Sequence, residues 1–217
     1  MSTSSSPAIP GFDCPLCPRL AAFRVAQRAA APSWHNAPVP SFGDLGARLL
    51  IVGLAPGLKG ANRTGRPFTG DYAGVLLYGT LKKFGLARGE YAGRADDGLT
   101  LVDCRITNAV RCVPPANKPE PDEIRACGRF LAAEIRAMLR LAAILALGQI
   151  AHQAILGALE HKRARYPFGH GAIHELPGGP VLADSYHCSR YNTNTGALTV
   201  DMFEAVFANL KRYLALA

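Results

Sequence analysis

A long glycine-rich loop that follows a short apolar run constrains this sequence more than any other feature. Residues 49–52 are Leu-Leu-Ile-Val, which is typical of a strand buried on both faces of a sheet. Residues 53–71, GLAPGLKGANRTGRPFTGD, then contain five glycines and two prolines. In an open α/β sheet, ligands bind beyond the carboxyl ends of the strands, where glycines let backbone N–H groups approach a ligand closely. We therefore expect the active site in this loop.

Apolar runs alternate with amphipathic helical patterns along the rest of the chain. Strands are expected at about residues 48–52, 99–111, 142–147 and 181–186, and helices at about 19–30, 71–84, 121–139, 148–159 and 198–217. Residues 161–180 are expected to form an irregular loop or hairpin. Because strands alternate with helices, the sequence predicts a three-layer α/β/α sandwich around a mostly parallel sheet of four strands.

The length of 217 residues suits a single domain at residues 12–217, preceded by a disordered Ser- and Pro-rich tail at residues 1–11. Lysine and arginine number 24 against 16 acidic residues, and the resulting charge of +8 favours a polyanionic partner, either nucleic acid or an anionic membrane surface. The longest apolar run, residues 141–147, is far shorter than the ~20 residues of a membrane span, and the N-terminus lacks a secretory pattern. These features predict a soluble intracellular protein.

Four of the six cysteines form two pairs, Cys14 with Cys17 and Cys112 with Cys127. Four thiolates supplied in this way suit a tetrahedral zinc ion or an iron-sulfur cluster, and the spacing does not decide between them. The alternative is that Cys112 and Cys127 are merely small buried residues. Cys104 lies in a predicted strand and is expected in the core. We interpret the four-cysteine site as structural.

Three segments and the four cysteines together resemble the family 5 uracil-DNA glycosylases, which are prokaryotic enzymes that hold a 4Fe-4S cluster. The segments are the loop at residues 53–71, NAVRCVPPANKP at residues 108–119 and HCSRYNTNTG at residues 187–196. The resemblance runs in order along nearly the whole chain. It implies a 4Fe-4S cluster and a monofunctional enzyme that hydrolyses uracil, and also hypoxanthine or xanthine, from DNA to leave an abasic site.

The resemblance implies several roles within the glycine-rich loop. Phe68 would stack on a flipped-out base, and Gly53 and Gly57 would line the base pocket. Ala55 matches the position at which other families place a water-activating Asp or Asn, so Asp71 becomes the suggested carboxylate. Each role has a simpler alternative, since Phe68 could anchor the loop and Asp71 could be the N-cap of the following helix.

The other two segments supply the remaining candidates for base recognition and catalysis. By resemblance, Asn108 reads the edge of the base, Asn117 lies near the sugar and the attacking water, and His187 contacts a uracil carbonyl oxygen. Many relatives have Pro where Cys188 follows this histidine. The simpler alternatives are a turn-forming Asn117 and a core or surface His187. His161, His170 and His174 lack ligand spacing and are interpreted as loop residues.

DNA that contains deaminated bases is the expected partner, and the chain is expected to act as a monomer in the prokaryotic cytoplasm, associated with the nucleoid. Basic loops would meet the phosphates, and residues 190–195 could form a wedge that enters the duplex. The candidate DNA-binding residues are Lys59, Arg63, Arg66, Lys118, Ser189, Arg190 and Asn192.

Three other functions compete with this interpretation. A nucleotide-binding enzyme would suit a glycine loop after a strand, but the loop has neither G-x-G-x-x-G nor G-K-[ST]. A non-enzymatic, metal-stabilised nucleic-acid-binding protein would share the charge and the cysteines, and only the active-site loops argue against it. A glycosylase that acts mainly on deaminated purines is the third alternative.

Overall fold

The computed structural model describes residues 7–215, and its centre is a five-stranded sheet in the order β4-β1-β5-β7-β6. The strands are β4 (Cys104–Asn108), β1 (Leu49–Gly53), β5 (Ala143–Leu147), β7 (Val181–Ser185) and β6 (Ile173–Glu175). The first four are parallel, and β6 pairs antiparallel with β7. The predicted count of four strands was therefore wrong by one, because the three residues of β6 are too few to show a strand periodicity.

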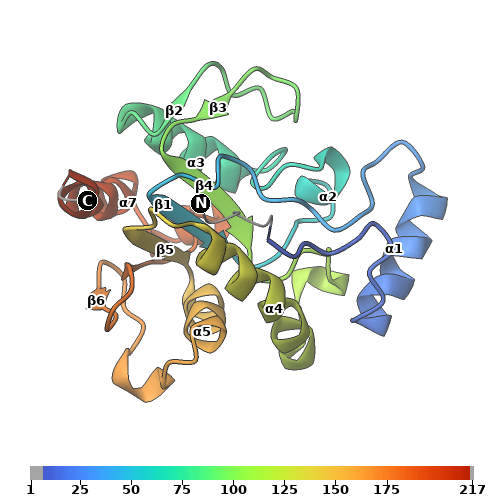
Figure 1. Cartoon of the computed structure of the whole chain (residues 1–217). Coiled ribbons are helices and arrows are strands. Elements are labelled where there is room, and N and C mark those ends of the chain that lie inside the picture. The colour runs from blue at the N-terminus through green and yellow to red at the C-terminus, as the bar shows by residue number, and fades with distance from the viewer. Residues whose placement is uncertain (1–6, 216–217) are drawn as a thin grey trace, which may run out of the picture.

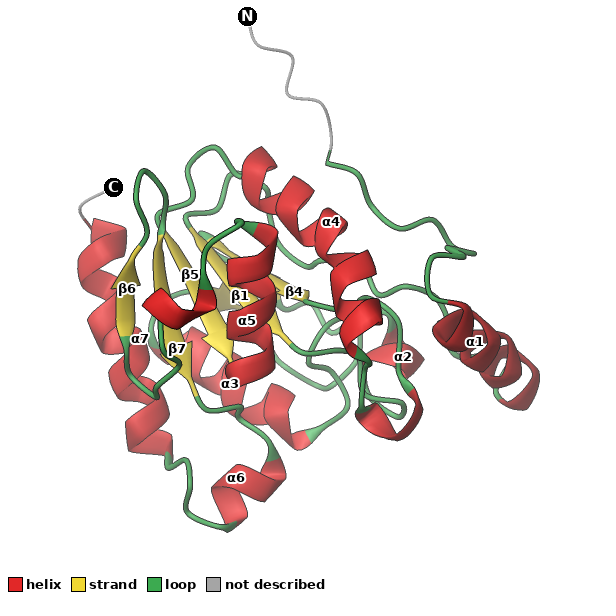
Figure 2. Ribbon diagram, turned by 90° about the horizontal axis from the view of Figure 1, so that it is seen from below, coloured by secondary structure: helices red, strands yellow, loops and turns green. Residues whose placement is uncertain are grey.

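Helices cover both faces of the sheet, which confirms the predicted α/β/α sandwich (Figure 1). One face carries α4 (Pro121–Ala137) and α5 (Gln149–Ala158), and the other carries α3 (Tyr72–Lys83) and α7 (Val200–Ala215). Figure 2 shows α1 (Pro18–Ala30) at the margin of the molecule, outside these layers. None of the helices within residues 7–215 has the length and apolar character needed to cross a membrane.

The alternating side chains of β1 explain why both faces need helices. Leu49 and Ile51 belong to the apolar cluster that α3 and α7 complete, whereas Leu50 and Val52 belong to the cluster completed by α4 and α5. All four side chains are fully buried. Successive side chains of a strand point to opposite faces, so an entirely apolar strand requires a core on each side.

The strand predicted at residues 99–111 is two short strands. β3 (Thr100–Leu101) pairs antiparallel with β2 (Ala87–Arg88) in a small separate ribbon, and β4 begins at Cys104. Asp103 separates them with a φ of +51°, a conformation that an extended strand does not contain. The Asp103 carboxylate also accepts a hydrogen bond from the backbone N–H of Arg48, which fixes this corner against the start of β1.

Short elements complete the loops. They are α2 (Ala61–Thr64), α6 (Arg190–Asn194) and the 3-10 turns η1 (Pro115–Asn117) and η2 (Arg163–Arg165). The predicted disordered tail lies partly outside the described residues, since description starts at residue 7, and residues 7–11 contain neither helix nor strand. The segment predicted as a wedge, residues 190–195, is the short helix α6 and its C-cap.

Candidate active site

A cavity of about 280 Å³ lies where the loops after β1, β4 and β7 meet. These strands are parallel, so their carboxyl ends reach the same edge of the sheet. The loops therefore converge although they are far apart in the sequence. The cavity is lined by Leu54, Ala55, Gly57, Ala61, Phe68, Asp71, Ala73, Asn108, Asn117, His187 and Ser189.

The last residues of β1 and β4 form a tight floor under the cavity. Gly53 pairs in register with Asn108, which is buried. A Cβ atom at Gly53 would lie 2.5 Å from Asn108 Oδ1 and 2.6 Å from Phe68 Cζ, closer than nonbonded atoms approach. Only glycine therefore lets the Asn108 amide and the Phe68 ring meet above the end of β1.

Asp71 has two environments, one for each carboxylate oxygen. Oδ1 accepts a hydrogen bond from the Gly74 backbone N–H at 3.0 Å, so the predicted N-cap of α3 is confirmed. Oδ2 faces the glycine-rich loop, where Cβ atoms at Gly57 and Gly60 would lie 3.6 and 3.1 Å away. The side chain reaches solvent, but protein atoms surround much of the carboxyl group. This burial raises the pKa of Asp71, while the Gly74 hydrogen bond opposes the shift.

His187 faces Phe68 inside the cavity. The two rings are nearly parallel, with an interplanar angle of 27° and centroids 6.0 Å apart. Burial lowers the pKa of His187, so the imidazole is neutral at neutral pH. Its backbone carbonyl accepts a hydrogen bond from Asn192 Nδ2 at 2.7 Å. Asn192, a predicted DNA contact, thus also fixes the loop that carries the histidine.

Three further predicted residues lie around the cavity. Ala55 lines it and brings no polar side chain, while Asn117 lines it from the η1 turn with a φ of +56°. The buried Cys188 thiol, next to His187, donates to the Ala73 carbonyl at 3.6 Å and so links the loop after β7 to α3. Ser189 caps α6 by accepting a hydrogen bond from the Asn192 backbone N–H.

Four of the five basic residues expected at DNA are exposed, namely Lys59, Arg63, Lys118 and Arg190. The prediction for Arg66 must be corrected. Its side chain is only 4% exposed, and both terminal guanidinium nitrogens donate to Asp97 at 2.7 Å. A guanidinium held in this way is not available to a phosphate.

The four paired cysteines face one apolar cavity between α1, α4 and the end of β4. They line it together with Leu20, Val110 and Phe130. Two N–H groups point at sulfur atoms, since Arg24 Nη1 lies 3.3 Å from Cys112 Sγ and the Arg111 backbone nitrogen lies 3.3 Å from Cys127 Sγ. Burial raises the pKa values of Cys17 and Cys127 to about 11. The predicted pairs are therefore brought together, and Cys104 is a core residue as expected.

Arg24 is the most unusual neighbour of these cysteines. It is buried, and its second terminal nitrogen donates to the Cys14 carbonyl at 3.1 Å. Within residues 7–215 it forms no ion pair with a carboxylate, and its Nε has no hydrogen-bond partner. A buried cation without a carboxylate is costly unless another anion lies close, and deprotonated cysteines would supply that anion. The donor set thus fits a site that holds thiolates.

A second group of possible ligands was not expected from the sequence. His152, His174 and Asp184 are the only described side chains whose ligand atoms lie, as a set of three or more, within 4.8 Å of one another. Asp184 accepts from His152 Nδ1 at 2.7 Å and from His174 Nε2 at 3.1 Å, and His152 Nε2 bonds to the Tyr166 carbonyl. Because these atoms already bond to one another, we interpret the group as a structural network. Asp184, a charged residue within the apolar strand β7, was the sequence feature that could have indicated this network.

Comparison with known proteins agrees with this fold and cavity. The family model described as the uracil DNA glycosylase superfamily matches residues 40–211, which span the sheet, the glycine-rich loop and both later cavity loops. The chain therefore belongs to the uracil DNA glycosylase superfamily.

Within the superfamily, the chain groups with the type-5 enzymes. It is 47% identical over 209 residues to a Type-5 uracil-DNA glycosylase of Thermus thermophilus, with 94% of each chain covered. It is 44% identical over 210 residues to that of Mycobacterium tuberculosis, covering 92% of this chain and 77% of the relative. The corresponding protein of Pyrobaculum aerophilum is 41% identical over 198 residues, covering 89% and 86%.

Proposed function

We propose that this protein hydrolyses the N-glycosidic bond between uracil and deoxyribose in DNA and leaves an abasic site. The observation that carries the proposal is the convergence of Phe68, Asp71 and His187 on one cavity at the carboxyl edge of the sheet. An aromatic face, a carboxylate and a neutral imidazole are the groups that this reaction needs.

A target base must leave the duplex before the enzyme can reach its glycosidic bond. The extruded uracil would stack on Phe68, and the Asn108 amide would recognise its edge. Stacking and edge hydrogen bonds replace the interactions that the base loses on leaving the helix. The rigid floor at Gly53 supports this role, because it holds Asn108 and Phe68 against each other.

Cleavage leaves the sugar electron-poor and the departing base negatively charged. His187 would donate a hydrogen bond to the uracil carbonyl oxygen on which this charge develops, and one such donor is typically worth ~2.7–4 kcal/mol of transition-state stabilisation. A neutral imidazole can donate through one ring nitrogen, and burial keeps His187 neutral.

Asp71 would act on the water that attacks the sugar carbon. The Asp71 Oδ1 atom accepts the helix-cap hydrogen bond, whereas Oδ2 faces the glycine-rich loop. Oδ2 would therefore accept a proton from the water while the water oxygen forms a bond to C1′ of the sugar. The negative charge would also stabilise the cationic sugar. The base leaves as an anion and takes a proton from solvent. Asn117 would hold the same water from the opposite loop.

We also propose that hypoxanthine and xanthine are substrates. Ala55 gives the cavity no polar side chain at the position that activates water in other families, so recognition depends on stacking and on a few hydrogen bonds. A cavity of about 280 Å³ with small residues at Ala55, Gly57 and Ala61 supports the acceptance of bases larger than uracil.

We propose a 4Fe-4S cluster for the four cysteines. The four cysteines line one apolar cavity, and N–H groups of Arg24 and Arg111 point at two of their sulfur atoms. Such hydrogen bonds to sulfur are typical of iron-sulfur sites, and they support this proposal. When bound, the cluster would supply structural cross-linking. Arg24 would balance its negative charge, and the site would join α1 to α4 beside the loop that carries Asn117.

DNA would approach over the exposed basic residues of the cavity loops, and α6 would lie against the duplex. We also propose that the protein acts as a monomer. We propose a DNA repair role for the protein in the prokaryotic cytoplasm, close to the nucleoid.

A three-substrate assay tests the proposal. Purified protein is incubated with labelled duplexes that contain a U·G pair, an I·T pair or no deaminated base, and abasic sites are then cleaved with alkali. We expect product from the first two duplexes and none from the third. Binding without product from either deaminated duplex would favour the non-enzymatic nucleic-acid-binding alternative.

A further inference from the structure

Three consecutive backbone carbonyls before and at Phe68 each accept a hydrogen bond from a side-chain hydroxyl. Thr69 Oγ1 donates to the Arg66 carbonyl at 2.6 Å, Tyr78 Oη to the Pro67 carbonyl at 2.7 Å, and Tyr91 Oη to the Phe68 carbonyl at 3.0 Å. The three hydroxyls come from the loop itself, from α3 and from the segment between β2 and β3. The chain that carries the Phe68 ring is thus held from three directions.

Phe68 needs such support because its backbone is strained. Its φ of +55° lies in the left-handed region, which a bulky side chain seldom adopts and which costs of order 1–3 kcal/mol. Gly74 shows how closely the surrounding structure is fitted to this conformation, since a Cβ atom there would overlap both the Phe68 carbonyl oxygen and the Tyr91 hydroxyl. The strain persists only because neighbouring groups determine the conformation.

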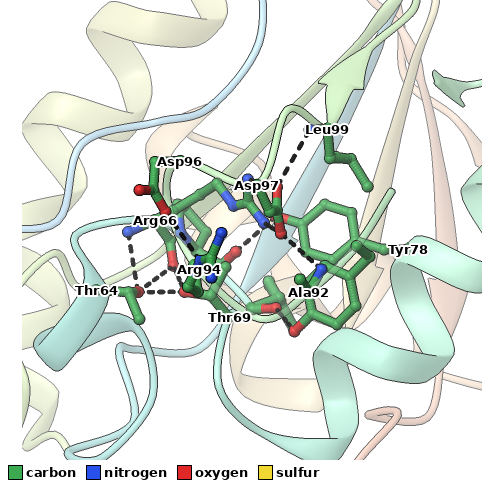
Figure 3. A network of polar contacts seen from close by, with 12 residues as sticks. Thr64, Arg66, Thr69, Tyr78, Ala92, Arg94, Asp96, Asp97 and Leu99 are labelled. Atoms are coloured by element: carbon green, nitrogen blue, oxygen red, sulfur yellow. Dashed lines mark hydrogen bonds and ion pairs between the residues drawn. The ribbon is translucent and has the colours of Figure 1, made fainter. Parts of the chain in front are cut away.

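The Arg66–Asp97 ion pair lies beside Tyr78 (Figure 3), and the Arg66 guanidinium also lies near the Tyr91 ring. The two tyrosine rings stack with centroids 4.8 Å apart, and the Arg66 guanidinium lies 5.3 Å from the Tyr78 ring and 5.9 Å from the Tyr91 ring. Asp97 binds Arg66 through both oxygens and also accepts from the backbone nitrogens of Ala92 and Leu99. The Arg66–Asp97 pair therefore fixes the loop that delivers Tyr91.

We propose that Tyr91 and Tyr78 are positioning residues for base recognition, which hold Phe68 in its left-handed conformation so that its ring meets the extruded base. This inference rests on the proposed stacking role of Phe68. It gives Arg66 a function that differs from the phosphate contact expected from the sequence.

A double-mutant cycle in uracil release tests this role. Tyr91→Phe removes only the hydroxyl and should lower the single-turnover rate about 3- to 10-fold, the loss expected for one hydrogen bond, with duplex affinity unchanged. In a Phe68→Ala background the same change should have no further effect, because the ring to be positioned is absent. Tyr78→Phe should behave in the same way. Tyr213→Phe on α7 is the matched control and should leave the rate unchanged.

The cycle has two outcomes that overturn the proposal. The first is an unchanged single-turnover rate in Tyr91→Phe. The second is an equal loss of rate when Tyr91→Phe is made in the wild type and in the Phe68→Ala background. A second readout needs no activity, namely the three-bond HN–Hα coupling of Phe68 in NMR spectra, which reports its φ angle. We expect the coupling to change in Tyr91→Phe and to stay constant in Tyr213→Phe. Absence of uracil release by the wild type would refute the proposed function, whereas an unchanged coupling in Tyr91→Phe would refute the positioning role.

Discussion

Asp71 accepts the backbone N–H of Gly74 at 3.0 Å with one carboxylate oxygen and presents the other to the glycine-rich loop. The same side chain therefore begins helix α3 and faces the cavity. Helix capping and catalysis are usually competing explanations for such an aspartate, but here the geometry allows both. Substitutions can separate the two roles, because they depend on different properties of the carboxylate.

Asp71→Asn keeps a cap oxygen and removes the charge, whereas Asp71→Ala removes both. We expect both variants to lose at least about 100-fold in single-turnover uracil release, the usual lower range for a general base, with little change in duplex affinity. Only the alanine variant should lose about 1 kcal/mol of stability through the missing cap. Rapid-quench kinetics and thermal unfolding measure the two effects. A fully active asparagine variant would leave only the capping role.

The raised pKa of Asp71 predicts how stability changes with pH. Burial favours the protonated carboxyl group and so raises the pKa of Asp71 in the folded protein above its unfolded value. The protonated side chain therefore stabilises the fold below the unfolded pKa, and this contribution is lost as pH rises through the folded pKa. At neutral pH the ionised carboxylate therefore costs stability. Asp71→Asn should melt at the same or a higher temperature than the wild type at neutral pH, and this advantage should disappear in acid. The pH–rate profile of the wild type should fall towards acid as Asp71 is protonated.

Gly53→Ala tests the floor of the cavity. The added methyl group would collide with Asn108 Oδ1 and Phe68 Cζ, so we expect a destabilisation of about 1–3 kcal/mol together with loss of uracil release. Gly79→Ala is the control, since a Cβ atom there meets nothing within 4 Å and alanine should stabilise helix α3 by up to about 1 kcal/mol. An active Gly53→Ala protein would show that the floor can relax.

Cys112→Ser tests the proposed cluster. The variant should lose the broad visible absorbance near ~400 nm that an iron-sulfur protein purified without oxygen displays, and its solubility should fall with it. Cys104→Ala removes a buried cysteine outside the cluster and should keep the absorbance and the iron content. Stoichiometric zinc in a colourless wild-type protein would contradict a cluster.

Removal of exposed positive charge should weaken DNA binding without altering sequence preference. Lys118→Ala and Arg190→Ala should each reduce the slope of log affinity against log salt by about 1 if each side chain neutralises one phosphate. Arg129→Ala, in the groove between α4 and α5, should leave the slope unchanged. A slope equal to that of the wild type in all three variants would show that the duplex binds elsewhere.

The sequence predicted the parts of the structure that local patterns determine. The apolar residues 49–52 and the glycines after them indicated a buried strand that leads into a functional loop, because both patterns act over a few residues. The resemblance of three loop motifs to the family 5 enzymes predicted that Phe68, Asn117 and His187 share one site, and all three line the cavity. The capping role of Asp71 also followed from its position before an amphipathic helix.

Long-range partners explain what the sequence did not predict. Arg63 and Arg66 look equivalent within one basic stretch, but Arg66 is buried because Asp97, 31 residues away, binds it. Tyr91 lies in a polar segment without periodicity, so nothing local indicated that its hydroxyl reaches the Phe68 carbonyl. The break at Asp103 depends on a contact with Arg48, and such a contact leaves no local pattern.

Release of free uracil by the wild type and by Asp71→Asn, compared at equal occupancy of a U·G duplex, tests the central claim most directly. Chromatography of the reaction would quantify the free base, and a binding titration would set the occupancy. We predict rapid release of one uracil per duplex by the wild type and release at least about 100-fold slower by the variant. Equal release by the two proteins, or binding by the wild type without any release, would contradict the account.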